Sequence, residues 1–173
     1  MIKGIIISFF LLFSLSVKGQ KIVTYATGFE ISHAWMVEVD PSTVYEALTQ
    51  DVGQWWNGDH TYSLDAKNMY FVLKQPGCLC EQLPNSGWVE HLRLVYLAPG
   101  KEIRLVGGLG PLQSMAVNGI MILTLGQEGA YTKLQLVYKV GGNEAIRDWA
   151  QPVAGVLVEQ FDRLVEHMKK GKN

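Results

Sequence analysis

The chain has 173 residues, of which 48% are hydrophobic and 18% are charged, and its formal net charge at pH 7 is −1. This composition excludes a disordered chain, because the apolar residues are numerous enough to build the core of a single domain. The balance of 15 Lys and Arg against 16 Asp and Glu provides no basic surface for a phosphate backbone, so no nucleic acid partner is expected. Two cysteines are too few for a disulfide scaffold or a four-cysteine zinc site.

The N-terminal residues have the pattern of an export signal. A basic opening at residues 1–3 precedes an uncharged apolar run at residues 4–15, which is shorter than the roughly 20 apolar residues of a spanning helix. Gly19 then places a small side chain directly before an expected cleavage point. We expect a signal peptide over residues 1–19 and an exported, periplasmic or secreted domain over residues 20–173, with no stable membrane span after cleavage. The alternative is an uncleaved anchor helix.

Residues 30–39 are predicted to form a strand, and two short helices follow. The Asp-Pro-Ser sequence at 40–42 is a typical helix start, with a capping side chain followed by a proline in the first turn. A second short helix or turn carries the double tryptophan at 55–56 and ends at the Asn-Gly-Asp sequence of residues 57–59.

The segment from residue 68 to residue 140 is predicted to be an antiparallel sheet. Runs of five to ten residues rich in Val, Leu, Ile and Tyr alternate there with Pro- and Gly-containing turns, and this spacing is typical of successive hairpins. In residues 132–140 the apolar side chains alternate with Lys and Gln. One face of the sheet is therefore expected to be exposed to solvent.

After residue 143 the hydrophobic period becomes helical and predicts one long amphipathic helix that extends to about residue 168. Pro152 is expected to kink this helix or to restart it, because proline cannot donate the hydrogen bond to the residue four positions earlier. The helix must bury its apolar stripe on the sheet. The expected fold class is therefore α+β, with a first strand, two short helices, about six further strands and a long C-terminal helix.

Several strings resemble a known family. The segment V-E-V-D-P-S-T-V-Y-E-A-L-T, the double tryptophan, the G-W-V string, the Pro-Gly-Lys turn at 99–101 and the closing G-V-L-V-E-Q-F-D-R-L are similar to the START/SRPBCC superfamily. This superfamily includes the birch-pollen-allergen-like proteins. The branch that these strings resemble is related to the activator of the heat-shock-protein ATPase. H-T-Y-S at 60–63, G-C-L-C-E at 77–81 and G-G-L-G-P-L-Q at 107–113 resemble a largely uncharacterised bacterial subgroup of that branch.

The resemblance implies a helix-grip fold, in which a curved sheet of about seven strands wraps around the long helix. It also implies a hydrophobic cavity between helix and sheet that binds or transforms small apolar molecules. The chain lacks the G-x-x-x-x-G-K-[ST] phosphate loop, so nucleotide hydrolysis is not expected. Neither a cofactor nor a metal is expected. The residues expected to bind the ligand are Trp56, Tyr62, Cys78, Cys80, His91, Gln113, Tyr138, Val153, Leu157 and Phe161.

Cys78 and Cys80 are two residues apart, so in a strand both sulfurs lie on one face with their Cα atoms about 6.5–7 Å apart. Three interpretations stay open: buried inert thiols, a strained disulfide, or a metal or redox site completed by His60 or His91.

Two positions are weak candidates for acid–base chemistry. His60 and Tyr62 lie in the loop after the double tryptophan, where a titratable histidine and a tyrosine donor could orient or activate a ligand. The alternative is a structural loop histidine with satisfied hydrogen bonds. His91 shares strand parity with Arg93, so either both face inward and form a polar end of the cavity, or both lie on the solvent face, which is the slightly favoured interpretation. The glycine-rich turn at 107–111 is expected at the cavity mouth, with Gln113 capping it or meeting a ligand.

Three functions are compatible with these features. The first is an exported protein that binds a hydrophobic small molecule. The second is a cyclase- or isomerase-like enzyme that acts on an apolar substrate, and the third is a protein-interaction module related to co-chaperones. A cavity without convergent titratable groups favours the first, and a histidine that points into the cavity favours the second. A filled core with an exposed apolar patch favours the third.

The export signal leads to a direct prediction. Protein recovered from the periplasm or the culture medium should begin at or near Gln20, because the apolar run and the small residue at 19 form a cleavable signal. Intact-mass spectrometry measures the mature N-terminus, and retention of Met1 in the exported material would contradict the prediction.

Overall fold

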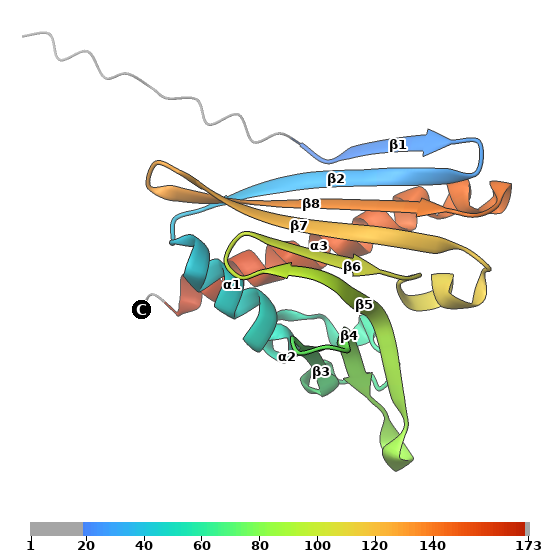
Figure 1. Cartoon of the computed structure of the whole chain (residues 1–173), viewed down its shortest axis with the longest axis horizontal. Coiled ribbons are helices and arrows are strands. Elements are labelled where there is room, and N and C mark those ends of the chain that lie inside the picture. Colours follow the sequence, from blue (N-terminus) through green and yellow to red (C-terminus); the bar gives the residue numbers. More distant parts are fainter. Residues whose placement is uncertain (1–18, 172–173) are drawn as a thin grey trace, which may run out of the picture.

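The computed structural model describes residues 19–171, so nearly all of the expected signal peptide lies outside the described residues. This part of the chain is an α+β domain with a helix-grip fold, in which a long helix lies across one face of a curved sheet (Figure 1). The strands are β1 (Lys21–Tyr25), β2 (Gly28–Val37), β3 (Met69–Val72), β4 (Gly77–Gln82), β5 (Trp88–Ala98), β6 (Glu102–Val106), β7 (Asn118–Glu128) and β8 (Tyr131–Gly141). The α-helices are α1 (Pro41–Gln50), α2 (Val52–Trp55) and α3 (Ala150–Lys170).

The sheet has eight strands in the order β1-β2-β8-β7-β6-β5-β4-β3, and every neighbouring pair is antiparallel. The sequence predicted about seven strands and missed β1, which forms a hairpin with β2 at the edge of the sheet. The six strands predicted between residues 68 and 140 are present. Because β2 pairs with β8, the first predicted strand and the last strand lie side by side in the sheet.

The start of α1 is capped as its sequence predicts. The Asp40 carboxylate accepts hydrogen bonds from the Ser42 and Thr43 backbone N–H groups, each at 3.0 Å, and Pro41 lies in the first turn. The hydroxyls of Ser42 and Thr43 also donate to this carboxylate. These bonds, of which the Ser42 hydroxyl makes the largest contribution, hold the pKa of Asp40 well below its usual value.

Pro152 restarts the helix rather than kinking it. Residues 144–149 form 3₁₀ turns (η5, Glu144–Trp149), and α3 begins at Ala150. Pro152 is therefore the third residue of α3, where its missing N–H would have no partner within the helix. The restart allows the chain to change direction between β8 and α3.

The buried stripe of α3 packs on the concave face of the sheet. The face of β8 that carries Leu134, Leu136 and Tyr138 is completely buried, as its alternating pattern predicts. From the helix, the buried side chains are Ala150, Val153, Ala154, Leu157, Gln160, Phe161, Leu164 and Met168. No helix among residues 19–171 has both the length and the apolar character that a membrane crossing requires.

Cys78 and Cys80 form a disulfide within β4. Their Cα atoms are 5.4 Å apart, closer than expected for a regular strand, and the pairing of β4 with β5 shifts register between Leu79 and Cys80. Leu79 belongs to the core beneath α3. Because side chains alternate along a strand, both sulfurs lie on the opposite face of the sheet from Leu79.

A disulfide that closes so short a loop removes little conformational entropy from the unfolded chain. Replacing both cysteines, Cys78→Ala with Cys80→Ala, should therefore lower the free energy of unfolding by only about 1–2 kcal/mol. Urea denaturation measures this change, and a thiol assay on denatured wild type should find no free cysteine. A loss of all folded protein in the double variant would show that the bridge has a larger role.

Candidate functional site

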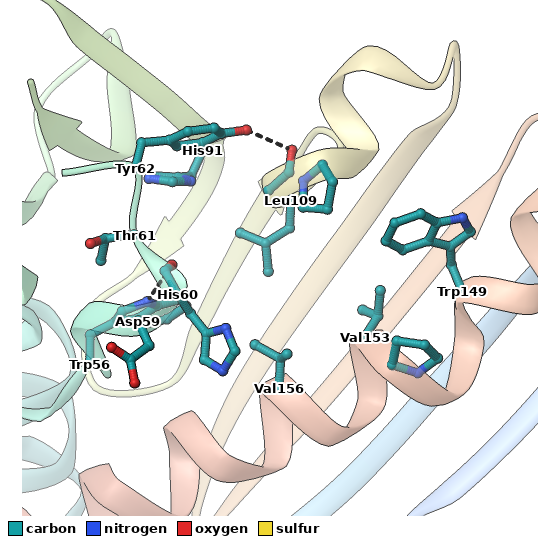
Figure 2. A pocket seen from close by; sticks show the side chains of 13 residues that line it. Trp56, Asp59, His60, Thr61, Tyr62, His91, Leu109, Trp149, Val153 and Val156 are labelled. Carbon is teal, nitrogen blue, oxygen red and sulfur yellow. Dashed lines mark hydrogen bonds between the residues drawn. The ribbon is translucent and has the colours of Figure 1, made fainter. Parts of the chain in front are cut away.

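A cavity of about 330 Å³ opens at the N-terminal end of α3. Three segments enclose it, and Figure 2 shows their side chains facing one another across the space. One wall is the start of α3, a second is the loop from Trp56 to Tyr62, and the third is the turn at Leu109–Pro111 together with β5. The residues that line it are Trp56, Asp59, His60, Thr61, Tyr62, His91, Leu109, Gly110, Pro111, Trp149, Pro152, Val153 and Val156.

Tyr138 holds the turn that forms the third wall. Its buried hydroxyl donates to the Gly107 carbonyl at 3.0 Å and accepts from the Leu109 N–H at 3.1 Å. Gly119 makes room for this ring, because a Cβ at that position would come within 2.7 Å of it. Burial raises the pKa of Tyr138 to about 12. The tyrosine therefore acts as a neutral structural group behind the wall.

The loop after α2 is fastened to α3 by its backbone and side chains. The Asn57 N–H donates to Gln160 Oε1 at 2.6 Å, and the Asn57 side-chain amide donates to Glu159 Oε1 at 2.7 Å. Glu159 also lies 3.4 Å from His60 Nε2, while the Trp56 indole donates to the His60 carbonyl at 3.3 Å. These contacts fix the distance between the first and second walls.

A buried carboxylate connects the second wall to the sheet. Glu81 is completely buried on β4, and its two oxygens accept from the backbone N–H groups of Tyr62, at 3.1 Å, and Ser63, at 2.5 Å. Glu81 Oε2 also lies 2.9 Å from Nε2 of His91, which is 3% exposed. The Glu81–His91 pair therefore joins β4, β5 and the loop in one polar cluster at the cavity wall.

The pKa values of this pair favour one charge state. Burial raises the pKa of Glu81, but the hydrogen bonds from Ser63, Tyr62 and His91 together lower it by a larger amount. The net shift of the pKa is therefore downward. Burial lowers the pKa of His91 by more than the bond to Glu81 raises it. At neutral pH the pair is an ionised carboxylate that accepts from a neutral imidazole.

Tyr62 bridges two walls of the cavity. Its ring stacks on the His91 imidazole with 5.8 Å between ring centroids and 27° between planes. Its hydroxyl donates to the Gly110 carbonyl at 3.2 Å, as the dashed line in Figure 2 shows. The side chain is 53% exposed. One hydrogen bond at the protein surface thus closes this side of the cavity.

The structure brings together only part of the predicted ligand-binding set. Trp56, Tyr62, His91 and Val153 line the cavity, as does the acid–base candidate His60. The disulfide of Cys78 and Cys80 lies on the far face of the sheet and Tyr138 behind the wall. Gln113 donates to the Glu90 carbonyl at 2.6 Å and is not a lining residue. His60 faces Glu159 and the Tyr62 hydroxyl faces Gly110, so these two candidates are engaged with different partners.

An elongated cavity along the whole of α3 is not present. Leu157 and Phe161 are buried in the core, and the void beside them measures only about 10 Å³. Aromatic side chains fill this region, since Phe161 stacks on Trp35 at 5.2 Å and meets Trp55 at 5.9 Å between ring centroids. The open space is therefore confined to the first two turns of the helix.

The expectation that His91 and Arg93 share one face of the sheet is wrong, and so is the slightly favoured solvent-face position of His91. Leu79 pairs with Leu92 and Cys80 with Glu90, so His91 is an extra residue in β5. This β-bulge turns both His91 and Leu92 inward and leaves Arg93 exposed. A bulge depends on pairing with the neighbouring strand, so the alternation of a single strand could not indicate it.

Sequence reasoning missed Glu81, Asp59, Thr61 and Trp149. Glu81 ends the string G-C-L-C-E, and an acidic residue at the end of an apolar strand could have indicated a buried carboxylate. The lining backbone at Gly110 and Pro111 was expected at the cavity mouth, and it is part of the wall.

Comparison with solved structures supports the architecture. A protein from Arthrobacter aurescens has a TM-score of 0.62 at 10% identity over 90% of this chain and 93% of its own. CalU16 from Micromonospora echinospora has a TM-score of 0.60 at 12% identity, over 87% and 83% of the two chains. Protein MLL2253 from Mesorhizobium loti has a TM-score of 0.59 at 16% identity, over 82% and 97%.

These likenesses show a shared fold. No family model matches the chain, and no curated protein matches it either.

The Glu81 cluster predicts a pH-dependent loss of stability. Because the folded-state pKa of Glu81 is lowered, its contribution is present above its unfolded pKa of about 4.3 and is lost as the pH falls through the folded-state value. Glu81→Gln should cost about 2–3 kcal/mol at pH 7, since the amide has only one accepting oxygen and its hydrogen bonds lose the assistance of the charge. The deficit should shrink toward pH 3.

Urea denaturation at several pH values measures this difference. Glu159→Gln is the matched control, because that carboxylate is exposed at the surface, and it should change the unfolding free energy by less than about 1 kcal/mol. An Glu81→Gln deficit that stays constant from pH 7 to pH 3 would contradict the assignment of an ionised carboxylate.

Proposed function

We propose that this protein binds a small apolar molecule in the cavity at the start of α3. The observation that carries the proposal is the cavity itself. Its volume of about 330 Å³ lies at the lower end of the range of ligand sites. It takes a molecule of two or three fused rings more readily than a long lipid chain.

The lining chemistry supports an apolar occupant. Trp56, Trp149, Val153 and Val156 supply most of the apolar wall, and the polar groups gather near the loop side with Tyr62 and His91. An apolar wall with a few polar groups is the usual composition of a small-molecule site. Affinity there comes chiefly from removing ligand surface from water, at roughly 25 cal/mol per Å².

The superfamily of the chain and its export are part of the same proposal. We place the chain in the START/SRPBCC superfamily, near the branch related to the heat-shock-protein ATPase activator, on the strings of sequence that resemble it. The helix-grip fold supports this placement, since it is the fold that the resemblance implies. We also propose that the domain acts after export, which the apolar run at residues 4–15 supports.

A bulky residue at the cavity wall tests the binding function. Val156 lines the cavity and is only partly buried, so Val156→Trp should fill the space without forcing the core apart. Gln151→Trp is the matched control, because it adds the same ring at an exposed position in the first turn of α3. Fluorescence titration with a naphthalene-based probe measures binding, and thermal unfolding checks that both variants fold.

We expect the probe to bind wild type and Gln151→Trp alike and to lose at least about tenfold in affinity for Val156→Trp, since a filled cavity forfeits the buried ligand surface. A folded Val156→Trp that binds as wild type does would place the site elsewhere. If no apolar probe binds wild type, the binding proposal fails.

A further inference from the structure

His91 has one ring nitrogen with no partner among the described residues. Nε2 faces the Glu81 carboxylate at 2.9 Å, while Nδ1 is buried and makes no hydrogen bond. Buried polar atoms are nearly always hydrogen-bonded, and leaving one unsatisfied is unfavourable. This unpartnered atom belongs to a side chain that lines the cavity, so it is a candidate for contact with a ligand.

Glu81 decides what kind of contact Nδ1 can make. A carboxylate only accepts hydrogen bonds, and Glu81 already holds the N–H groups of Tyr62 and Ser63. Nε2 must therefore carry the proton of the neutral imidazole that it shares with this carboxylate. Nδ1 is left with a lone pair, and it can only accept a hydrogen bond.

From this geometry we infer that His91 Nδ1 is the recognition group for a ligand hydroxyl, an inference that rests on the proposed binding function. The ligand class is then an apolar ring system that carries one O–H donor, such as a phenol. The O–H donates to Nδ1, and the rings lie against the apolar wall formed by Trp149, Val153 and Val156.

Tyr62 controls access to this nitrogen. Its ring stacks on the imidazole, and its position depends on the single hydrogen bond to the Gly110 carbonyl at 3.2 Å. The ring is half exposed, so it can turn outward when that bond breaks. The ligand then takes the place of the Tyr62 ring over the imidazole, and its hydroxyl donates to Nδ1.

Three probes of similar size separate the hydroxyl contact from binding in general. Naphthalene has no polar group, 1-methoxynaphthalene has an oxygen without a donor, and 1-naphthol has the donor. Titrations at pH 7 compare their affinities for wild type and for two variants of His91. We expect wild type to prefer 1-naphthol over 1-methoxynaphthalene by about 3–10-fold, as one hydrogen bond in a shielded site contributes.

Each of the two variants, His91→Gln and His91→Asn, keeps a polar atom at the position of only one ring nitrogen. In His91→Gln the side-chain amide can occupy the position of Nε2 and donate to Glu81, but no polar atom remains at the position of Nδ1. His91→Asn keeps a polar atom near Nδ1 and cannot reach Glu81. His91→Gln should lose the preference for 1-naphthol and keep its affinity for naphthalene within about twofold. His167→Gln is the control and should keep the preference, because His167 faces Asp51 at 3.0 Å and does not line the cavity.

The outcomes separate the inference from the proposed function. If naphthalene binds wild type but 1-naphthol gains nothing over 1-methoxynaphthalene, the hydroxyl contact is wrong and the apolar site stands. If folded His91→Gln keeps the preference, His91 is not the recognition group. If none of the three probes binds, the proposed function itself fails, and the inference with it.

A measurement on wild type covers the case in which His91→Gln does not fold. In a long-range ¹H–¹⁵N spectrum, the resonance of His91 Nδ1 should have the position of an unprotonated nitrogen. It should move on addition of 1-naphthol and stay in place with naphthalene at equal occupancy. A protonated Nδ1, or equal shifts with both probes, would overturn the inference.

Discussion

The buried Glu81 carboxylate determines the arrangement of the candidate site. A charge inside a protein is tolerated only when hydrogen bonds replace its lost hydration, and Glu81 obtains them from two backbone N–H groups of the loop and from His91. The same bonds bring the loop against the sheet, select the tautomer of the imidazole and place Tyr62 over it. One desolvated group thus couples the position of a wall to the chemistry of its polar end.

Helix packing explains why the cavity lies where it does. Over most of its length α3 packs directly on the concave face of the sheet. There Phe161 of α3 contacts Trp35 of β2 and Trp55 of α2, and these rings fill the available volume. At its first turns, which follow the 3₁₀ segment before Ala150, the helix presents Pro152, Val153 and Val156 to the cavity. These smaller side chains do not reach the opposite wall, which the Tyr138 hydroxyl holds in place from behind. The space between them remains open.

The periodic parts of the chain were predictable from sequence. The alternation in residues 132–140 follows from a sheet with one buried face, and the Asp40 cap and the stripe of α3 follow from local hydrogen bonding and amphipathicity. The edge strand β1 was not predicted, because its side chains are mostly exposed and its sequence therefore lacks an alternating apolar pattern. Of the candidate site, Trp56, Tyr62 and Val153 were named from their position and family pattern. The orientation of His91 stayed open, because it depends on an extra residue in β5 that appears only when the register of β4 is known.

The sequence by itself determined the α+β class, the order of most elements and the helix that covers the sheet, because these depend on contacts between residues near one another in the chain or on a regular period. Only the tertiary structure decided which end of the helix leaves a cavity and which polar groups reach it. Glu81 lies 19 residues from Tyr62 and 10 residues from His91 in the sequence, and their meeting depends on strand register and on the cost of burying a charge. No local pattern of residue types predicts a contact between residues so far apart in the chain.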